Sequence, residues 1–301
     1  MNNPFLTILT PSYNRADRLP ELYKSLMNQT NQNFQWLVVD DGSTDNTQEV
    51  LSNFNKHRFD FDFYLKENGG KHTALNYSHP YIKGQFVCIV DSDDWLIPNA
   101  VEKINGIYSQ YADNERIASF IFQRGGDDAI PLNKGFRSEI TISNDIDYRV
   151  NSSSKGDCCE VIRSSVFISY PFPVHEGEKF LAEGFLWQHV GFHYDTVYIN
   201  DVIYVCEYLE GGLSKSGRRL RIQCPLGGMD NSNSYFEKVP GRRVKLPVLL
   251  KEAMLFDCYG KFAKLSFREI VKKCRNHYLS VLAYPFGYLL YKYWNFKYMH
   301  E

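Results

Sequence analysis

The stretch FQWLVVDDGSTD (residues 34–45) sets the pattern for the first third of the chain. Its run of large apolar residues ends abruptly in Asp40 and Asp41. Short, uninterrupted apolar runs of this kind are typical of strands that are buried on both faces of a parallel sheet. The polar residues at 43–45 are good helix N-caps, so the pattern predicts a strand at 34–40 followed by a turn and a helix.

The same alternation of apolar runs and amphipathic stretches continues on both sides of this segment. We expect further strands at residues 5–10, 61–65, 86–90 and 117–122, and helices at residues 19–29, 71–77 and 98–107. Such alternation predicts an α/β fold with a mostly parallel sheet and helices on both faces. Beyond residue 122 the sequence predicts a helix at 184–191, two strand runs separated at Asn200-Asp201 within 197–208, a mobile Gly/Ser/Arg-rich loop at 211–229, and a helical extension from Lys245.

The composition is that of a folded protein without a strong charge bias. The 301 residues include 34 Lys and Arg against 35 Asp and Glu, and 15% of the residues are aromatic. A general nucleic-acid-binding protein would show a large basic excess, so we expect no nucleic-acid partner. The seven cysteines contain no C-x-x-C pair, which favours free thiols in a reducing cytoplasm over a zinc site or a disulfide framework.

Two segments bear on where the protein works. The N-terminus runs directly into an apolar strand pattern without a basic region and an apolar core before it, so we expect no signal peptide. The longest uncharged stretch, residues 276–291, is shorter than the roughly 20 residues that span a membrane, and Pro285 and Gly287 interrupt it. We therefore expect a cytoplasmic protein without a transmembrane helix.

Acidic residues follow two of the expected strands. The strand at 34–40 ends in a pair of aspartates, and DSDD (residues 91–94) follows the strand at 86–90. Ligands of an open parallel sheet bind beyond the carboxyl ends of its strands, where these acids would repel one another without a cation between them. The alternating carboxylates Asp91 and Asp93 suit Mg²⁺ or Mn²⁺, which proteins hold with one or two carboxylates plus substrate phosphates. Turn and helix-cap chemistry is the alternative for acids at these positions.

The motifs of two common nucleotide-binding classes are missing. The segment after the first strand is Thr10-Pro11-Ser12-Tyr13-Asn14, where a dinucleotide-binding enzyme would have G-x-G-x-x-G. The sequence also contains no G-x-x-x-x-G-K-[ST], which disfavours P-loop NTPases. A nucleotidyltransferase on a related fold would need a basic, glycine-rich loop after the first strand, and residues 10–14 do not supply one.

Four segments, taken in order, resemble glycosyltransferase family 2, the inverting enzymes of the GT-A fold. They are LTILTPSYNRADRLPELYKSL (6–26), WLVVDDGSTDNT (36–47), ENGGKHTALNYS (67–78) and GQFVCIVDSDDWLIPNAV (84–101). As an ordered set they are highly specific, and the likeness thins after Phe122. The resemblance implies a Rossmann-like GT-A domain, a nucleotide-diphosphate-sugar donor, and Mn²⁺ or Mg²⁺ as cofactor.

The resemblance also assigns roles within the first hundred residues. The nucleoside pocket would be lined by Pro11, Tyr13 and Asp41. Further contacts to the nucleotide would come from Asn68, Gly70, Lys71 and Ser92. Asp41 would face the base, and the metal-binding pair would be Asp91 and Asp93, with Asp94 orienting the pair. An exposed helix position is the alternative for Lys71.

An inverting transfer needs a general base that takes the proton of the acceptor hydroxyl. The family usually supplies it at the start of a helix in the second half, often in a Glu-Asp pair. Glu183 is the counterpart here, although Gly184 stands where the second acid is expected. Glu176 and Glu178 are the other candidates for the base. The alternative role for Glu183 is that of an acid at a helix N-terminus that only interacts favourably with the helix dipole.

Basic residues and histidines of the second half give further candidates. A loop closing over the diphosphate would carry Lys215, Arg218, Arg219 and Arg221. A solvated basic loop is the alternative. Third metal ligands would come from His175, His189 and His193. For His189 and His193 a structural or acceptor-side role is favoured, because the pair lacks the acid of an H-E-x-x-H motif.

Together these observations predict a GT-A catalytic domain at 1–215, with a donor-binding half (1–110) and an acceptor-binding half (111–215), followed by a basic loop and helical extension (216–301). The predicted activity is hexosyl or N-acetylhexosaminyl transfer from a UDP-sugar to a glycan or lipid-linked glycan in surface polysaccharide biosynthesis. A non-catalytic subunit that binds sugar nucleotides or glycans is the alternative. The basic, aromatic tail suits peripheral contact with the inner face of the cell membrane, or a hairpin packed on the domain or in a homodimer.

Overall fold

The computed structural model describes residues 4–54, 58–126, 130–132, 135–136, 138–152, 156–206 and 213–299, with the side chains of the last range from residue 217 on. The chain divides into two compact units. The first unit comprises residues 1–144, 155–171 and 194–208, and the second comprises residues 145–154, 172–193 and 209–301.

The described residues of the first unit build one nine-stranded sheet. Its strands are β1 (Leu6–Ser12), β2 (Phe34–Asp40), β3 (Asp60–Leu65), β4 (Phe86–Ile89), β5 (Trp95–Leu96), β6 (Ile117–Gly125), β7 (Ile140–Ser143), β8 (Cys158–Arg163) and β9 (Asp195–Val205). Their order is β3-β2-β1-β4-β8-β6-β9-β5, and β7 pairs with β9. Strands β1 to β4 are mutually parallel, β6 is parallel to β9, and β5, β7 and β8 run antiparallel to their neighbours. The sheet is mixed, with four parallel and four antiparallel pairings. The prediction of an α/β fold is confirmed, and its parallel strands are β1 to β4 and the pair β6 and β9.

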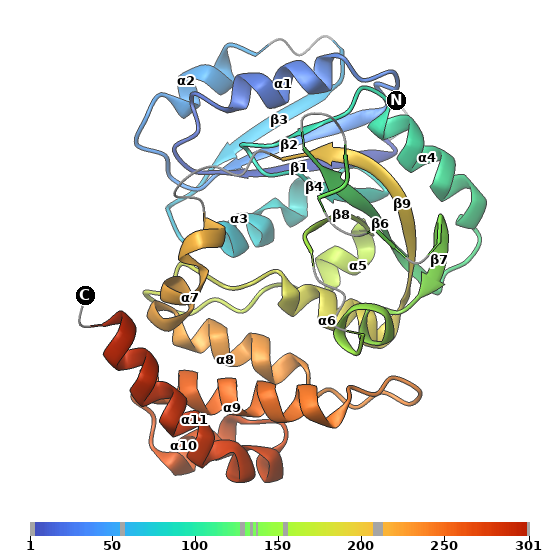
Figure 1. The fold of residues 1–301 in the computed structure, drawn as a ribbon. Coiled ribbons are helices and arrows are strands. Elements are labelled where there is room, and N and C mark those ends of the chain that lie inside the picture. The colour runs from blue at the N-terminus through green and yellow to red at the C-terminus, as the bar shows by residue number, and fades with distance from the viewer. Residues whose placement is uncertain are drawn as a thin grey trace. The chain divides into compact units, whose positions relative to one another are not determined.

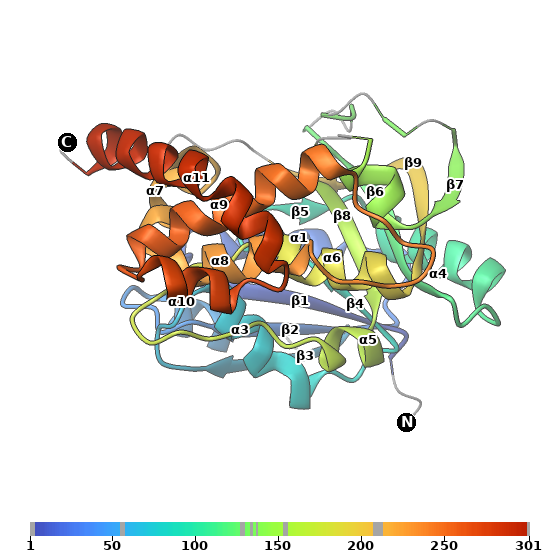
Figure 2. The same ribbon diagram turned by 90° about the horizontal axis from the view of Figure 1, so that it is seen from below.

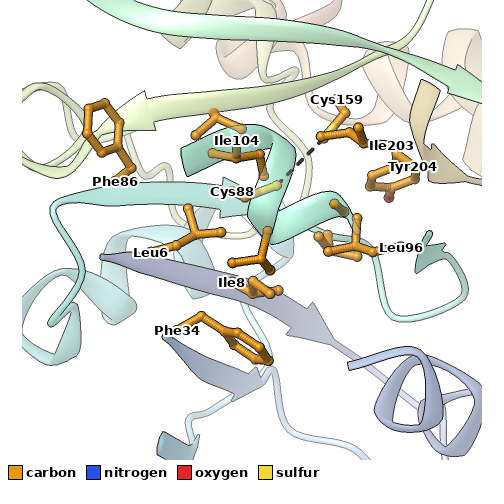
Figure 3. Packing of buried hydrophobic residues seen from close by; sticks show 14 of the residues in the cluster. Leu6, Ile8, Phe34, Phe86, Cys88, Leu96, Ile104, Cys159, Ile203 and Tyr204 are labelled. Carbon is orange, nitrogen blue, oxygen red and sulfur yellow. Dashed lines mark hydrogen bonds between the residues drawn. The ribbon is translucent and has the colours of Figure 1, made fainter. Parts of the chain in front are cut away.

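Helices cover both faces of this sheet (Figure 1). They are α1 (Leu19–Met27), α2 (Thr47–Ser52), α3 (Lys71–Ser78), α4 (Ala100–Tyr111) and α5 (Ser164–Ser169), with the single-turn η1 (His79–Tyr81) after α3. The apolar residues of α1, α2 and α4 pack on one face of the sheet, while α3 and α5 lie on the other. In the core of the first face, Ile8, Cys88 and Ile104 meet from β1, β4 and α4 (Figure 3).

Strand β9 differs from the prediction of two runs. It is continuous, because its register against β6 shifts at the polar pair: Phe122 lies opposite Ile199, and Gln123 lies opposite Val202. Asn200 and Asp201 are thus accommodated in a β-bulge, which leaves the apolar residues on either side buried. The polar interruption bends the strand without ending it.

The second unit is helical. It contains η2 (Ile146–Val150), α6 (Gly184–His193), α7 (Leu213–Gln223), α8 (Pro225–Ser234), α9 (Leu246–Phe262), α10 (Phe267–Lys273) and α11 (His277–Tyr298). Helices α9 and α11 pack against each other, as Figure 2 also shows. Their core is completed by buried residues of α7, α8 and α10, among them Ile222, Met229 and Ile270.

The expectation of a loop at residues 211–229 is wrong for its described part, since residues 213–223 and 225–234 form α7 and α8. The glycines and serines suggested a loop, but Ile222 and Met229 are buried against α9, and this packing outweighs weak helix propensity. Pro225 falls in the first turn of α8, where proline is tolerated. The pair Gly211-Gly212 lies outside the described residues.

A buried acid in the second unit gives a prediction about pH. The Asp257 side chain accepts a hydrogen bond from Ser280 (2.7 Å) through Oδ1, while Oδ2 has no hydrogen-bond partner among the described residues, and burial raises the pKa of this carboxyl to about 7. The folded chain therefore holds a proton that the unfolded chain releases near pH 4, so stability falls as the pH rises from about 4 to about 7. At most about 4 kcal/mol is lost over this range, from about 1.4 kcal/mol for each pKa unit.

We expect Asp257→Asn to flatten this pH dependence. An amide cannot ionise, so the variant should lose less stability than the wild type between pH 4 and pH 7, whatever constant offset the substitution adds. The part of the slope that comes from Asp94, whose pKa is also raised to about 7, should remain. Urea unfolding of both proteins at several pH values measures the slope. An unchanged slope in the variant would show that other groups produce the pH dependence.

Candidate active site

Three loops meet at the carboxyl edge of the parallel strands. Ser12 at the end of β1 lies opposite Asp40 at the end of β2, and Leu9 of β1 lies opposite Ile89 at the end of β4. The segments that follow these strands therefore begin at the same edge of the sheet, as predicted for a ligand-binding edge. The predicted Pro11 is buried near the end of β1, and the predicted Tyr13, the first residue after that strand, is 46% exposed.

The two aspartates after β2 have different partners. Asp40 is fully buried and its Oδ1 accepts hydrogen bonds from the amide (3.0 Å) and hydroxyl (2.6 Å) of Ser43, which is the turn chemistry given above as the alternative. The carboxylate of Asp41 accepts hydrogen bonds from Lys66 Nζ (2.6 Å), from Asn68 Nδ2 (3.2 Å) and from the amides of Gly69 (3.0 Å) and Gly70 (2.7 Å). Asp41 thus holds the loop before α3 in place.

Gly70 needs to be glycine for this arrangement. Its φ of 92° is rarely adopted by residues with a side chain, and in this conformation its amide points at Asp41. Gly70 is also the residue before α3, so the same turn sets the position of Lys71 at the first position of that helix. The structure thus brings the predicted Asp41, which follows β2, into contact with the loop that carries Asn68 and Gly70 and leads into Lys71.

The acidic residues after β4 are each balanced by a cation. Lys71 Nζ contacts Asp91 Oδ1, and Arg124 Nη1 lies 3.8 Å from Asp91 Oδ2. Arg15 Nη2 lies 3.6 Å from Asp93 Oδ2. Burial favours the neutral form of Asp91, but the charges of Lys71 and Arg124 outweigh it and hold the pKa of its carboxyl below the ordinary value. Ser92, predicted to contact the nucleotide, is buried.

Two residues that the sequence did not indicate, Tyr204 and Arg124, contact the aspartates of this cluster. The hydroxyl of Tyr204 donates to Asp94 Oδ2 (2.7 Å) and accepts from the amide of Asp91 (3.0 Å). The Arg124 guanidinium lies 4.2 Å from the centre of the Tyr204 ring and 3.8 Å from Asp94 Oδ2. Arg124 lies in β6 and Tyr204 in β9, and a charged residue in a mostly buried strand such as β6 indicates that the charge has a partner.

The third aspartate of the cluster, Asp94, is a weaker acid than a free aspartate. Burial raises the pKa of Asp94 to about 7, and the nearby charge of Asp91 adds to the rise, while the hydrogen bond from Tyr204 acts against it. Asp94 is buried, whereas the side chains of Asp91 and Asp93 are each 27% exposed. The two predicted metal ligands are therefore the members of the cluster that can reach a bound molecule.

This donor set fits a divalent cation that shares its ligands with a substrate. Carboxylate oxygens suit Mg²⁺ and Mn²⁺. Among the described residues, no group of three or more His, Cys, Asp or Glu side chains is arranged to hold a metal by itself. Asp91 and Asp93 would therefore supply one or two ligands, and phosphate oxygens and water the rest. Such a cation would compete with Lys71 and Arg15 for these carboxylates.

The candidate bases belong to the second unit. The backbone carbonyl of Glu183 accepts from the amides of Leu186 (2.9 Å) and Trp187 (3.3 Å), so Glu183 stands at the start of α6, and its side chain is half-buried. Glu178 plays a different part, because its two carboxylate oxygens accept from the amides of Leu226 and Gly227 (2.8 Å each) at the first turn of α8. A carboxylate there satisfies unpaired helix amides and favours the helix dipole.

Gly184, which replaces the expected second acid, lies close to two polar side chains. A Cβ atom there would be 3.1 Å from Gln188 Nε2 and 3.3 Å from Asn231 Oδ1. Gln188 is itself fixed, because it donates to the hydroxyl of Tyr235 (2.7 Å) and accepts from Ser234 (3.0 Å). A side chain at position 184 would require these partners to shift.

The three histidines that the sequence indicated as metal ligands contact carboxylates in the second unit. Nε2 of His175 lies 2.5 Å from Asp230 Oδ2, and Nε2 of His193 lies 2.6 Å from Glu237 Oε1. His189 Nε2 lies 3.6 Å from the other oxygen of Glu237. In these positions the three side chains link elements of the helical unit.

The predicted phosphate-binding arginine Arg218 lies on α7 next to α11. Its Nη1 donates to the hydroxyl of Tyr298 (3.3 Å), and its guanidinium lies 5.2 Å from the centre of the Trp294 ring. Arg218 is exposed, and so is Arg219. The side chain of Lys215 lies outside the described residues. A contact between Arg218 and a diphosphate stays a prediction.

Comparison with known proteins decides the family. The sequence profile of glycosyl transferase family 2 matches residues 7–167, which is more than half of the chain. The chain belongs to glycosyl transferase family 2. The matched segment runs from β1 to α5 and contains Asp41, Lys71 and the acidic cluster after β4.

Glycosyltransferases of known sequence match between a third and two thirds or more of the chain. TuaG of Bacillus subtilis (strain 168), provisionally described as a teichuronic acid biosynthesis glycosyltransferase, is 33% identical over 102 residues, 33% of this chain and 40% of TuaG. The hyaluronan synthase of Pasteurella multocida is 36% identical over 99 residues, 33% of this chain and 10% of the synthase. This match thus spans less than half the length of these two proteins. Glycosyltransferase GlyG of Streptococcus pneumoniae serotype 4 is 27% identical over 225 residues, 70% of this chain and 73% of GlyG.

Solved structures share the fold. Residues 1–349 of S. aureus TarS, in complex with UDP-GlcNAc, align with a TM-score of 0.64 at 14% identity, covering 97% of this chain and 91% of that chain. The mannosyltransferase PcManGT from Pyrobaculum calidifontis, in complex with GDP-Man and Mn²⁺, aligns with a TM-score of 0.57 at 18% identity, covering 99% of this chain and 84% of that chain. The prediction of a GT-A fold of family 2 is confirmed.

Proposed function

We propose that the protein is an inverting, metal-dependent glycosyltransferase that moves a hexosyl or N-acetylhexosaminyl group from a UDP-sugar to a glycan or lipid-linked glycan in surface polysaccharide biosynthesis. The observation that carries the proposal is the acidic cluster after β4, which exposes Asp91 and Asp93 within the segment that matches family 2. TarS bound to UDP-GlcNAc and PcManGT bound to GDP-Man and Mn²⁺ support the donor class and the metal. The names of TuaG and the hyaluronan synthase support the pathway.

In this proposal the donor is bound within residues 1–110, and residues 111–215 contribute the acceptor side. The exposed Tyr13 contacts the nucleoside, and Asn68, next to Asp41, lies near the nucleotide. A divalent cation on Asp91 and Asp93 would stabilise the negative charge that develops on the departing diphosphate. Tyr204 fixes the position of the cluster, because its hydroxyl donates a hydrogen bond to Asp94 and accepts one from the amide of Asp91.

The chemical step forms one bond and breaks another at the anomeric carbon. The acceptor oxygen forms its bond to this carbon while the carbon–oxygen bond to the diphosphate breaks, and the nucleoside diphosphate leaves with the electron pair. The proton of the acceptor hydroxyl passes to the carboxylate of Glu183 as the general base. Attack opposite the leaving group inverts the configuration, which NMR of the linkage in the product checks.

A panel of nucleotide sugars tests the proposal directly. The purified chain is incubated with UDP-, GDP- and dTDP-sugars, with Mn²⁺, with Mg²⁺ or with EDTA, and nucleotide release is measured. We expect slow release from one UDP-sugar that requires the metal, because water replaces the missing acceptor. Equal release with EDTA would contradict metal dependence.

The same panel distinguishes the alternatives. Binding of a donor by calorimetry with no release, even when oligosaccharide and lipid-linked acceptors are supplied, would favour a non-catalytic binding subunit. Formation of a nucleotide sugar and pyrophosphate from a sugar phosphate and UTP would identify a nucleotidyltransferase. Failure to bind any donor would contradict the proposed function as a whole.

A further inference from the structure

Helix α11 presents a stripe of large apolar side chains to solvent. Of the 20 exposed large hydrophobic residues in the described part of the chain, nine lie between residues 278 and 299. The most prominent are Tyr278 (90% exposed), Leu282 (62%), Phe286 (62%), Leu289 (65%), Tyr293 (54%) and Phe296 (76%). Successive members are three or four positions apart, so they form one line along the helix, about 27 Å long at 1.5 Å per residue.

The charge around this stripe has one sign. Helix α11 contains no aspartate or glutamate. Lys292 and Lys297 flank the stripe on opposite sides at 100° per residue. The Lys292 ammonium lies 5.5 Å from the ring centre of Tyr288, and that of Lys297 lies 5.9 Å from the ring centre of Tyr293. From residue 264 to residue 299 the sequence has seven Lys and Arg and a single acid, Glu269, in a chain whose net charge is -1.

The opposite face of α11 is docked in the protein. Ser280, Ala283, Gly287 and Trp294 are buried, and the Ser280 hydroxyl donates to Asp257 of α9 (2.7 Å). At Gly287 a Cβ atom would lie 2.8 Å from the carbonyl oxygen of Met254, so the two helix backbones approach closely there. Across the described residues, no helix is long and apolar enough to cross a membrane. Only the outer half of α11 is therefore available to a partner.

We propose that the outer face of α11 docks the protein on the surface of an anionic lipid bilayer. Aromatic and aliphatic side chains on one face, with lysines at its borders, match a helix that lies in the interface plane. The basic residues complement acidic headgroups. A second copy of the chain fits this face less well, because two such faces would bring together positive charges without a carboxylate between them. The inference goes beyond the proposed function and does not depend on catalysis.

Vesicle sedimentation tests the docking surface without any substrate. The full chain is mixed with vesicles of phosphatidylcholine, with or without phosphatidylglycerol, and the pelleted fraction is measured. We expect binding to the anionic vesicles that weakens with salt. The triple variant Leu282→Ser/Phe286→Ser/Leu289→Ser should bind at least about tenfold more weakly, because burial of apolar side chains contributes much of the affinity. Each of Lys292→Gln and Lys297→Gln should weaken binding about fivefold, which corresponds to about 1 kcal/mol per lysine near the surface.

The matched control is Leu246→Ser, since Leu246 is 59% exposed at the start of α9 in the same unit. It should bind vesicles like the wild type. Circular dichroism melting establishes whether the triple variant is folded. The two single lysine variants leave the apolar stripe intact and therefore test the surface independently. Binding of the triple variant with wild-type affinity, or failure of the wild type to bind anionic vesicles, would overturn the proposal. So would a concentration-dependent dimer in sedimentation velocity that the triple variant abolishes.

Discussion

Asp93→Ala is expected to lower metal-dependent turnover of the donor about a thousandfold and to remove the effect of Mn²⁺ on UDP affinity. Asp93 is partly exposed next to Asp91, and its contact in the folded chain is the 3.6 Å ion pair with Arg15. Loss of this carboxylate removes one of the two ligands that can reach a cation bound to a diphosphate. Donor affinity without metal should change little.

Asp93 gives a cleaner test of the metal site than Asp91. Asp91 balances both Lys71 and Arg124, so its removal would leave two partly buried cations without their partner and would disturb the loop itself. Asp17→Ala is the matched control, because the 76% exposed carboxylate of Asp17 lies in the same unit and pairs with the neighbouring Arg18. Titration of each variant with UDP, with and without Mn²⁺, gives the affinities. Mn²⁺-dependent UDP binding that survives in Asp93→Ala would contradict the assignment of Asp93 as a ligand.

The sequence was most informative where local signals and burial agree. The strand at residues 34–40 was predicted with its observed bounds, because an uninterrupted apolar run ends at the two aspartates and is buried throughout. The acidic residues after β4 were recognised for the same reason: a buried strand fixes its direction, and the residue after its last apolar position must lie at the carboxyl edge. For the first hundred residues, periodicity and turn residues were therefore enough to place both acidic loops at one edge of the sheet.

The sequence was least informative where contacts between residues far apart in the chain determine the structure or the role of a side chain. Tyr204 donates to Asp94 from 110 positions away, and no local pattern distinguishes it from Tyr198, the other aromatic residue of β9. Glu178 was a rival of Glu183 for the role of base, and its contacts with the amides of Leu226 and Gly227 show that it has a structural role. Helices α7 and α8 form because their apolar residues find a surface on α9, which their glycine-rich sequence does not announce. In each case a long-range contact outweighs the local signal.

Glu183→Gln is expected to lower the rate of transfer by a factor of about 10² to 10⁴ while the donor affinity stays unchanged. The amide keeps the size and hydrogen-bonding shape of the side chain at the start of α6 but cannot accept the acceptor proton. Donor affinity by calorimetry and transfer rate at saturating donor separate the two effects. Metal-dependent binding of UDP should be retained, which distinguishes this variant from Asp93→Ala.

The rival acids supply the controls. Glu178→Gln should lower the melting temperature, because the carboxylate of Glu178 accepts hydrogen bonds from two backbone amides at the first turn of α8 and the substitution removes its charge. At a temperature where this variant is folded, its transfer rate should stay near the wild-type value. Glu176→Gln, at an exposed position in the same segment, should change neither quantity. If Glu183→Gln transferred sugar at the wild-type rate while Glu176→Gln lost activity with an unchanged melting temperature, the general base would be Glu176. Because these three acids lie within eight positions of one another, the set of variants assigns the proton acceptor by chemistry and stability together.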